Sequence, residues 1–579
     1  TINDITGDKA IGNDITGDKA IGNDILGNGA SASKTVRSEA LETETSLPNF
    51  RQGDAIILYE RNRDTDNVTN KMVFKGNIEY LTENEISIRL RATQQNPSVL
   101  PAESLYAIEH DTMDTTFRSM YQGLYIYLSA RKERRDLLLS QRPPRFDESL
   151  DSMISRSEDD FTRIALKAKA AQDYFLLIGP PGTGKTSCAL KKMVETFHAD
   201  KDAQILLLSY TNRAVDEICK SLASIAPAVD FIRVGSELSC DEAYRGHLIE
   251  NELSSCNRRS EVYERIRNCR IIVGTVAAIS GKPELFRLKH FDVAIIDEAT
   301  QILEPQLLGI LCARGEDGKD AIDKFVLIGD HKQLPAVVQQ NTEQSAIYDE
   351  SLLSIGLTNL KDSLFERLYR NCTATVHRSY DMLCRQGRMH PEVALFANRA
   401  FYGGRLIPVG LPHQIESSDT ICRLAFYPSV PEKAGASAKI NYSEARIVAD
   451  LAARIYEDHQ TDFDESRTLG IITPYRSQIA LIKKEIESLG IPALNRILVD
   501  TVERFQGSER DVIIYSFCVN YPYQLKFLSN LTEEEGVLID RKLNVALTRA
   551  RKQMFITGVP ELLERNPLYK SLLKLIEGS

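Results

Sequence analysis

The sequence predicts an α/β protein in which two parallel β-sheets, each covered by helices, follow one another along the chain. Three observations predict this class: short apolar runs without polar alternation recur, segments with helical spacing separate them, and the runs fall into two consecutive sets. Unalternated apolar strands with intervening helices are typical of parallel sheets that are buried on both faces. Two sets of such runs therefore indicate two lobes.

The apolar runs locate the two lobes. The first set comprises residues 174–179, 205–210, 270–275, 293–298 and 325–330, and the second comprises residues 424–429, 469–475, 497–502, 511–517 and 554–558. We expect the first lobe to span residues 151–360 and the second to span residues 361–579.

Three further parts are expected before the lobes. Residues 1–47 carry a ten-residue repeat and a Ser/Thr/Glu-rich stretch, which predict a flexible tail and linker because each repeat holds too few apolar residues for a core. Residues 48–112 alternate apolar and polar residues and predict a small β-barrel. Residues 113–150 predict a helical stalk, with one long helix over residues 115–140.

Length, composition and charge narrow the class of protein. A chain of 579 residues suggests three or four domains, and 42% hydrophobic with 26% charged residues is ordinary for a globular protein. No apolar run is long enough for a membrane span, and no charged-then-apolar segment of the sequence marks secretion. Thr1 at the first position indicates a processed chain or a piece of a longer one. The net charge of −10 argues against wrapping duplex DNA by bulk electrostatics, but it is compatible with a narrow channel that grips a few phosphates.

The ten cysteines point to the compartment. They are scattered without a CxxC pair, which favours reduced thiols over disulfides, zinc or an iron–sulfur cluster. We therefore expect an intracellular, cytoplasmic protein.

The most specific chemical motif is GPPGTGKT, which matches a P-loop directly after a strand and before a helix. Backbone N–H groups of such a loop cradle phosphates, Lys185 would reach the β- and γ-phosphates, and Thr186 would ligate Mg²⁺. The residues expected to bind the nucleotide are Gly179, Pro180, Pro181, Gly182, Thr183, Gly184, Lys185 and Thr186.

Two further strand ends supply the groups that a P-loop needs. Asp297 would hold Mg²⁺ through water, and Glu298 would polarise the attacking water. Their alternative is a solvated acidic pair at a strand end, which the P-loop makes less plausible. Gln333, after the strand at residues 325–330, would sense the γ-phosphate, and all three strand ends share the carboxyl edge of one sheet, where ligands bind in open α/β folds.

The order of motifs resembles the superfamily 1 helicases. From the N-terminal side the motifs are GPPGTGKT, SYTNRAVDEI, VGT, DEATQ, GDHKQLP, SLFERL, RQGRMHP, ITPYRSQ, DTVERFQGSERD and LNVALTRAR. The similarity covers roughly residues 160–560 and is greatest to the Upf-like/Dna-type clade, which contains the nonsense-mediated-decay helicase and the helicase–nuclease that processes Okazaki fragments. The resemblance implies two RecA-like P-loop NTPase lobes, preceded by a β-barrel and a helical stalk, with ATP and Mg²⁺ as cofactors.

The resemblance also implies roles for two arginines of the second lobe. Arg388 and Arg549 would reach across to the γ-phosphate, where such an arginine is typically worth about 10³–10⁵ in rate. An isolated arginine is more often a surface ion pair, but two in matching motifs favour the catalytic role. ATP binding would then draw the lobes together, and hydrolysis would release them.

Strand contacts follow from the same resemblance. The expected residues are Thr211, Asn212, Thr275, Pro474, Tyr475, Arg476, Thr501 and Gln506. Small hydroxyls and amides suit phosphate contacts, and an aromatic ring suits base stacking. Any one of them could instead be a helix cap.

Three positions depart from the family pattern. Thr162 stands where members commonly place a Gln that recognises adenine, and Gly387 stands where an aromatic residue usually precedes the motif arginine. Glu503 replaces a common Asp and keeps the carboxylate. We therefore expect a relaxed choice between ATP and other nucleoside triphosphates.

The leading hypothesis is an ATP-dependent helicase that moves 5′ to 3′ on single-stranded nucleic acid. A second hypothesis is a nucleic-acid-stimulated ATPase that remodels protein–nucleic-acid complexes without processive unwinding, and a third is a scaffold that binds strands without hydrolysis. Intact Lys185, Asp297, Glu298, Arg388 and Arg549 argue against the third. We favour DNA over RNA and expect no membrane partner, and no PD-(D/E)xK nuclease pattern is evident. Protein partners stay open.

Overall fold

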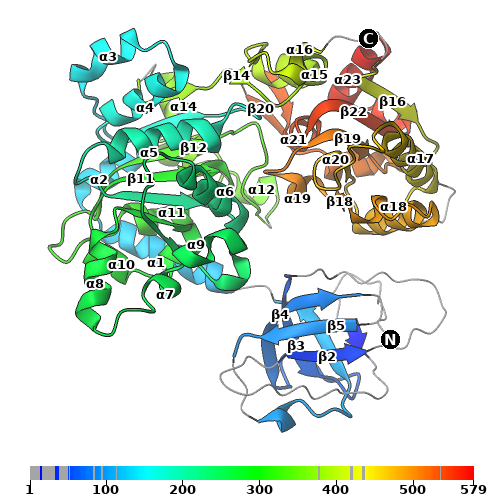
Figure 1. Cartoon of the computed structure of the whole chain (residues 1–579), viewed down its shortest axis with the longest axis horizontal. Coiled ribbons are helices and arrows are strands. Elements are labelled where there is room, and N and C mark those ends of the chain that lie inside the picture. The colour runs from blue at the N-terminus through cyan, green and yellow to red at the C-terminus, as the bar shows by residue number, and fades with distance from the viewer. Residues whose placement is uncertain are drawn as a thin grey trace. The chain divides into compact units, whose positions relative to one another are not determined.

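The computed structural model describes residues 13–15, 33–37, 50, 53–82, 85–92, 96–111, 114–338, 340–375, 378–416, 421–432, 437–534 and 536–578. The chain divides into two compact units, Thr1–Thr115 and Thr116–Ser579 (Figure 1). Among the described residues, no helix has both the length and the apolar composition that crossing a membrane requires.

The first unit is a six-stranded antiparallel sheet. Its order is β1 (Asn13–Ile15), β6 (Tyr106–His110), β3 (Ala55–Glu60), β4 (Val73–Leu81), β5 (Glu85–Leu90) and β2 (Ser33–Arg37). Alternate residues of β5 are buried, as the two-residue period predicts, and Ile56, Ile78, Ile88 and Ile108 form part of its core. The predicted barrel at 48–112 thus supplies four strands of this sheet. The predicted tail and linker at 1–47 lies outside the described residues apart from β1 and β2.

The expected single helix over residues 115–140 is two helices. α1 (Asp114–Ser129) and α2 (Lys132–Leu138) are separated at Arg131, whose ψ of 142° interrupts the helical backbone. The break lets α2 bury Leu137 and Leu138 in the core of the first lobe. The prediction of one long helix was therefore wrong, because burial of α2 outweighs the local helical propensity.

The second unit begins with a seven-stranded parallel sheet. Its order is β13 (Tyr380–Met382), β7 (Tyr174–Ile178), β12 (Ile322–Gly329), β11 (Phe291–Asp297), β8 (Ile205–Ser209), β10 (Ile271–Thr275) and β9 (Phe231–Val234). The five predicted runs of the first set are all strands of this sheet, and β9 and β13 are additional. The strands β7, β8, β9 and β10 are buried along their whole length, as expected for a sheet covered on both faces.

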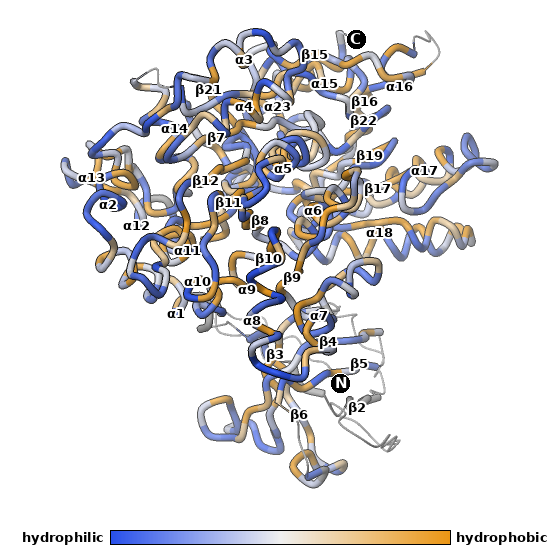
Figure 2. Tube along the Cα trace, turned by 60° about the vertical axis from the view of Figure 1, so that its left-hand side comes forward, coloured by the Kyte–Doolittle hydropathy of each residue, from blue (hydrophilic) through white to orange (hydrophobic). Residues whose placement is uncertain are grey.

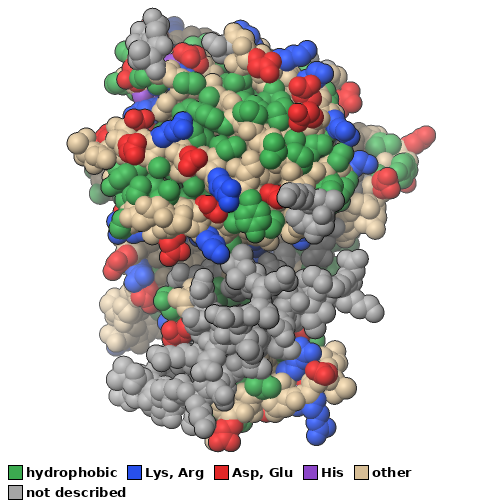
Figure 3. All heavy atoms as spheres, turned by 90° about the vertical axis from the view of Figure 1, so that its right-hand side faces the viewer, with side chains coloured by type: hydrophobic (Ala, Val, Ile, Leu, Met, Phe, Trp, Pro, Cys, Tyr) green, Lys and Arg blue, Asp and Glu red, His purple; other side chains and the backbone are tan. Residues whose placement is uncertain are grey.

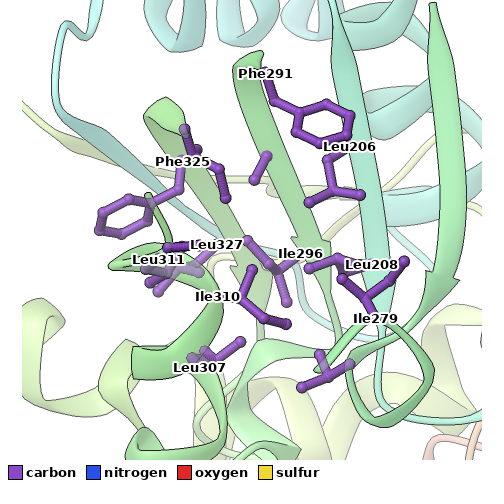
Figure 4. Packing of buried hydrophobic residues seen from close by; sticks show 14 of the residues in the cluster. Leu206, Leu208, Ile279, Phe291, Ile296, Leu307, Ile310, Leu311, Phe325 and Leu327 are labelled. Atoms are coloured by element: carbon purple, nitrogen blue, oxygen red, sulfur yellow. The ribbon is translucent and has the colours of Figure 1, made fainter. Parts of the chain in front are cut away.

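Helices cover both faces of this first sheet. One face carries α4 (Asp160–Ala170), α5 (Lys191–His198) and α6 (Asn212–Ala223). The other carries α2, α8 (Arg259–Asn268), α9 (Val276–Ser280), α10 (Glu284–Leu288), α11 (Glu304–Leu311) and α14 (Leu364–Ala374). Figure 4 shows this second face, where Leu307 and Ile310 of α11 and Ile279 of α9 face Leu208, Ile296 and Leu327 of the strands.

The first lobe extends beyond residue 360. β13 pairs with β7 in parallel, and Leu364, Phe365 and Leu368 of α14 belong to the core of the first lobe. The structure therefore places the passage between the lobes after Met382 rather than at residue 360, because α14 and β13 complete the first sheet before the chain leaves it.

The second lobe is a five-stranded parallel sheet. Its order is β16 (Leu424–Pro428), β22 (Ala550–Gly558), β19 (Arg510–Ser516), β17 (Leu469–Ile472) and β18 (Leu498–Asp500), which are the five runs of the second set. α17 (Tyr442–Asp458) and α18 (Arg476–Ser488) cover one face, and α15 (Pro391–Tyr402), α21 (Arg541–Leu547) and α23 (Pro567–Glu577) cover the other. Figure 2 shows hydrophobic and hydrophilic residues alternating along α17 and α18, as expected for helices with one buried face.

Smaller elements complete the second unit. Two short strand pairs belong to the second lobe, β14 (Arg385–Gln386) with β15 (Ile407–Pro408) and β20 (Leu531–Glu534) with β21 (Val537–Asp540). The remaining helices are α3 (Asp151–Arg156), α7 (Ile249–Glu252), α12 (Thr342–Ser345), α13 (Glu350–Ser354), α16 (Pro412–Ile415), α19 (Val502–Phe505), α20 (Leu525–Leu528) and α22 (Pro560–Leu563). In the view of Figure 3, acidic and basic side chains are interspersed among apolar ones rather than separated by sign.

Candidate nucleotide-binding site

The P-loop connects β7 to a helical turn at Lys185–Leu190 that leads into α5. Gly182 and Gly184 have φ of 75° and 76°, a backbone region that favours glycine. A Cβ at Gly179 would lie 2.0 Å from Cγ of Lys185, so only glycine lets the lysine side chain fold against the loop. Because the first N–H groups of a helix have no intrahelical partner, the loop can offer several donors to phosphate oxygens.

Two carboxylates lie opposite the P-loop. Thr186 Oγ1 donates to Asp297 Oδ2 at 2.5 Å, and Lys185 Nζ lies 3.7 Å from Glu298 Oε1. A hydroxyl and a carboxylate converging in this way are hard oxygen ligands of the type that Mg²⁺ prefers. The residues present therefore fit a magnesium-bound triphosphate.

The two carboxyl groups differ in their ionisation. Burial, followed by the charge of Glu298, raises the pKa of Asp297 to about 6. Burial also opposes the ionisation of Glu298, but Lys185 and Gln301 outweigh it and hold the pKa of Glu298 below its ordinary value. Glu298 therefore loses its proton at a lower pH than Asp297 does, and a residue that polarises water must be ionised.

Glu298 has an unusual backbone. Its φ is 53°, in the left-handed region that residues other than glycine rarely adopt. Gln301 Nε2 donates to Glu298 Oε2 at 2.9 Å and so holds the side chain in place. Such conformations persist where surrounding contacts over-determine them, and they are frequent at active sites.

Gln333 and Arg549 meet between the lobes. Arg549 Nη2 donates to Gln333 Oε1 at 3.2 Å, and Arg549 Nε donates to Val545 O at 3.0 Å. Arg549 is 2% exposed, and burial, followed by Arg388, lowers its pKa to about 9. Glu298 opposes this shift, so the guanidinium lies within the electrostatic reach of the carboxylate.

The backbone around Arg388 contacts the P-loop. The N–H of the preceding Gly387 donates to Gly182 O at 2.8 Å, and a Cβ at Gly182 would lie 2.4 Å from Cβ of Arg388. Its guanidinium instead faces the second lobe, where Nε donates to Glu509 Oε2 at 2.6 Å and Nη1 to Thr548 O at 3.2 Å. The structure thus brings the residue to the site with its charge turned toward Glu509.

Several polar residues of the site were not singled out from the sequence. Asp330, Tyr402, Glu509 and Asn544 all bond to site residues or to one another at the seam. Asp330, Glu509 and Asn544 lie within the quoted motifs and could have been found there. Tyr402 lies in none of them, because its contact with Asp330 arises only when the lobes pack together.

The candidate strand contacts of the first lobe follow β8 and β10, next to the nucleotide loops on the same sheet edge. Thr211 Oγ1 accepts from Ala214 N at 3.2 Å, and Thr275 Oγ1 accepts from Ala278 N at 3.1 Å. Both threonines therefore cap helices, the alternative that the sequence left open. Asn212 begins α6 and is exposed.

The candidates of the second lobe follow β17 and β18, again at the carboxyl edge. Pro474, Tyr475 and Arg476 lead into α18, and Arg476 is exposed. Tyr475 Oη accepts from Gln524 Nε2 at 3.1 Å, and the ring packs against the core of the second lobe, which limits its freedom to stack on a base. Thr501 precedes α19, and Gln506 follows it with a buried Nε2 that has no partner within the described protein.

Aliphatic side chains lie next to Gly387, the position where the family usually has an aromatic residue. A Cβ there would lie 3.2 Å from Leu411 Cδ1 and 3.4 Å from Val409 Cγ2. Both side chains remain about two-fifths exposed. Thr162 donates through Oγ1 to Asp159 Oδ2 at 2.6 Å at the start of α4. At the first departure from the family pattern, Gly387, the neighbouring surface is aliphatic. At the second, Thr162, the side chain is hydrogen-bonded to Asp159, the residue that caps α4.

A cavity of 780 Å³ lies at the opposite, amino edge of the first sheet. Its charged groups pair with one another, as in Arg142 with Asp173 at 2.8 Å and Arg134 with Asp320 at 3.5 Å. The chemistry of phosphate transfer is at the carboxyl edge instead, because the P-loop, Asp297 and Gln333 all lie there.

Comparison with known proteins agrees with this arrangement. Two family models, each described as an AAA domain, match the chain, one over residues 156–262 and 249–341 and the other over residues 360–561. The helicase/nuclease JHS1 of Arabidopsis thaliana, whose description is DNA replication ATP-dependent helicase/nuclease, is 28% identical over 94% of this chain and 40% of its own length. Human DNA2, which carries the same description, is 28% identical over 91% of this chain and 49% of its own length.

The chain therefore spans less than half the length of these two relatives. A solved arterivirus nonstructural protein 10, a helicase in complex with DNA, aligns at a TM-score of 0.39 and 13% identity over 90% of this chain and 80% of that chain.

Proposed function

Because the chain belongs to the superfamily 1 helicases, in the clade of the nonsense-mediated-decay helicase and the Okazaki-fragment helicase–nuclease, we propose that it is an ATP-dependent motor on single-stranded nucleic acid. The observation that carries the proposal is the contact between Arg549 and Gln333, 3.2 Å apart across the lobe seam. The contact joins Arg549 of the second lobe to Gln333 of the first, the residue proposed to sense the γ-phosphate, and it supports a chemistry that would depend on how the lobes are docked.

The residues divide the work of hydrolysis. The P-loop and Lys185 would hold the phosphates, and Glu298, ionised beside Lys185, would accept a proton from the attacking water. Thr186 and Asp297 would hold a Mg²⁺ ion, which supplies Lewis-acid stabilisation of the phosphate oxygens when bound.

Arg388 supplies the second cation after a change of partner. Its guanidinium is paired with Glu509 at 2.6 Å, while its backbone already lies against Gly182. A triphosphate carries more negative charge than one carboxylate, so its arrival would compete for the guanidinium. Closure of the lobes and the turn of Arg388 toward the phosphates would therefore occur together.

Movement on a strand would follow from that closure. The candidate strand contacts lie on both lobes, at the ends of β8 and β10 in one and of β17 and β18 in the other. A change in lobe separation would shift one set of contacts relative to the other. The clade implies 5′-to-3′ movement with duplex unwinding, and we favour DNA over RNA because JHS1 and DNA2 are described as DNA replication proteins.

The alternative is a nucleic-acid-stimulated ATPase that remodels complexes without processive unwinding. The same site chemistry supports it, so the two functions differ only in the work done on the strand.

One set of measurements tests the proposal. ATP turnover is measured without nucleic acid, with single-stranded DNA and with single-stranded RNA, and strand displacement is then measured on duplexes with a 5′ or a 3′ tail. We expect stimulation by DNA and displacement only from the 5′ tail, while Glu298→Gln binds nucleotide without turnover. Stimulation without displacement from either tail would favour the remodelling ATPase, and displacement from the 3′ tail alone would overturn the direction.

We also propose a relaxed choice of nucleoside triphosphate. The aliphatic side chains of Val409 and Leu411 beside Gly387 offer no hydrogen bond to a base edge, and Thr162 is engaged with Asp159. Without polar groups at the base, a site discriminates weakly between bases. GTP and CTP should be hydrolysed within about tenfold of ATP, and Thr162→Gln should sharpen the preference for ATP. Inert GTP and CTP under conditions where ATP turns over would refute this proposal.

A further inference from the structure

A buried polar network joins the two lobes beside the nucleotide site. Asp330, directly after β12, accepts hydrogen bonds on Oδ2 from Gln333 Nε2 at 2.8 Å and from Tyr402 Oη at 2.7 Å. Tyr402 Oη in turn accepts from Asn544 Nδ2 at 2.8 Å. Asp330 and Gln333 belong to the first lobe, whereas Tyr402 on α15 and Asn544 on α21 belong to the second. All four residues are at most 4% exposed.

The network fixes the orientation of the Gln333 amide. A carboxylate only accepts hydrogen bonds, so the NH₂ end of Gln333 must face Asp330. The amide oxygen is then left to accept from Arg549 Nη2 at 3.2 Å. The position of Asp330 therefore determines which end of Gln333 faces the arginine and the phosphates.

The hydroxyl of Tyr402 has one proton, and the network determines where it points. Because Asn544 donates to the hydroxyl oxygen, the proton is directed to Asp330. Burial, followed by the charge of Asp330, raises the pKa of Tyr402 well above its ordinary value. The hydroxyl therefore remains a donor throughout the range in which an enzyme works.

We propose that Tyr402 is a positioning residue for nucleotide hydrolysis: its hydroxyl orients Asp330, Asp330 orients Gln333, and Gln333 is aligned with Arg549 only when the second lobe is docked. This inference rests on the proposed ATPase function. The hydroxyl of Tyr402 reaches the loop after β12 through Asp330, whereas its ring lies 5.9 Å from Lys332 Nζ of the same loop, a contact that does not involve the hydroxyl. Lobe docking thereby sets the alignment of the phosphate sensor as well as the position of the arginine.

A purely structural role is the competing explanation, because the Tyr402 ring also lies in the apolar core of the second lobe. Tyr402→Phe separates the two, since it keeps the ring and removes only the hydroxyl. With saturating single-stranded DNA, we expect kcat for ATP to fall by about tenfold to a hundredfold, the effect of one lost hydrogen bond to a charged group. The KM for ATP should change by less than about twofold, because the alignment matters in the transition state rather than in ground-state binding.

A double-mutant cycle with Gln333→Ala tests whether Tyr402 acts through Gln333. We expect the double variant to turn over no more slowly than Gln333→Ala alone. Multiplying losses would overturn the proposal, as would a kcat of Tyr402→Phe equal to that of the unmodified chain.

Tyr569→Phe is the matched control. Tyr569 is 1% exposed and donates to Asp540 Oδ2 at 2.9 Å, so it loses a buried tyrosine–aspartate hydrogen bond of the same kind within the second lobe. It should lower the melting temperature and leave kcat within about twofold. If both variants lower kcat alike, the effect is general destabilisation and the positioning role is rejected.

A replacement variant and the activity of the unmodified chain distinguish a folding failure, a failure of the proposed function and a failure of the role of Tyr402. If Tyr402→Phe does not fold, Asn544→Ala takes its place in the cycle, because it removes the donor that directs the Tyr402 proton. If the unmodified chain hydrolyses no nucleotide, the proposed function fails. If it hydrolyses ATP and the cycle is additive, only the role of Tyr402 fails.

Discussion

Gly182 meets two separate requirements in one residue. Its φ of 75° favours glycine, and a Cβ there would lie 2.4 Å from Cβ of Arg388. Gly403 has a similar φ of 60°, but a Cβ there would meet nothing within 4 Å. Comparing alanine substitutions at Gly182 and Gly403 therefore distinguishes the cost of a left-handed backbone from the cost of a clash with Arg388.

We predict that Gly182→Ala raises the KM for ATP by at least about tenfold, because it displaces the loop that carries Arg388. Gly403→Ala should cost only about 1 kcal/mol of stability from its left-handed backbone and leave the kinetics unchanged. Steady-state kinetics and thermal unfolding of both variants check the prediction. Equal kinetic effects of the two would contradict the steric argument.

Glu444 makes the stability of the folded chain, rather than its catalysis, depend on pH. It is fully buried, and its Oε2 accepts from Ser516 Oγ at 2.6 Å and from Cys518 N at 2.8 Å. Burial outweighs these hydrogen bonds and raises the pKa of Glu444 from 4.5 to about 7. The folded chain thus binds this proton more tightly than the unfolded chain does.

Because the folded-state pKa is raised, the stabilising contribution is complete below pH 4.5 and is lost as the pH rises to about 7. We predict that Glu444→Gln removes a fall on the order of 3 kcal/mol in the free energy of unfolding across this window. Denaturant unfolding of both chains between these pH values measures it. Parallel stability curves for the two chains would show that Glu444 does not titrate in this way.

At the scale of elements, α1 and α11 pack through a pair of glycines. A Cβ at Gly123 would lie 2.4 Å from Pro305 O and 3.2 Å from Gly309 N, and one at Gly309 would lie 3.0 Å from the Cα of Gly123. Because the contacted atoms are backbone, they cannot move aside as a flexible side chain would. The two helices therefore approach closely only because both positions lack a side chain.

We predict that Gly123→Ala destabilises the second unit by about 1–3 kcal/mol, the usual cost of overpacking, although alanine favours a helix by about 1 kcal/mol over glycine. Gln122→Ala, at an exposed position of the same helix, is the control and should be neutral or slightly stabilising. Melting temperatures of the two variants decide the matter, and a stabilised Gly123→Ala would mean that α1 does not pack as described.

The elements that the sequence predicted share one physical property. All ten apolar runs are strands of the two parallel sheets. A strand that is buried on both faces can be recognised from its own unbroken apolar sequence, without knowing which strands pair with it. β9 and β13 were missed because neither has a run of consecutive apolar residues long enough to stand out: Arg233, buried with Asp216 as its partner, interrupts the four-residue β9, and Asp381 lies at the centre of the three-residue β13. The break between α1 and α2 was missed because it depends on tertiary burial.

The same distinction applies to the site. The P-loop was recognisable because eight consecutive residues contain its geometry. The network of Asp330, Tyr402 and Asn544 joins residues 72 and 142 positions apart and has no local pattern. Contacts of this kind arise from lobe packing, which a single sequence does not display.

For the second unit as a whole, the seam between the lobes is polar while each lobe keeps its own apolar core. Arg541 Nη2 contacts Glu366 Oε1 at 2.5 Å, and His331 Nε2 lies 3.1 Å from Glu534 Oε2. The apolar cluster around α15 and α21 of the second lobe also takes in Leu334 and Met382 of the first lobe. Water solvates separated ions well, so a polar seam costs less to open than an apolar one. This division suits lobes that separate and close again in each cycle.

The charge of the whole chain leads to the last prediction. The net charge is −10, and among the eight proposed strand contacts only Arg476 is a cation. Affinity for a single strand falls with salt by a slope of about −0.7 in log–log form for each phosphate neutralised. A motor that grips through hydroxyls, amides and few cations should therefore show a shallow dependence.

We predict a slope between about −1 and −3 for single-stranded DNA from roughly 50 to 200 mM salt, measured by fluorescence anisotropy of a labelled strand. Arg476→Ala should make the slope less negative by about 0.7 and weaken binding to a similar extent across sequences. A slope near −7 would require about ten neutralised phosphates. Binding would then use a basic surface elsewhere on the chain, and the proposed contacts at the carboxyl edges of the two sheets would not be the principal ones.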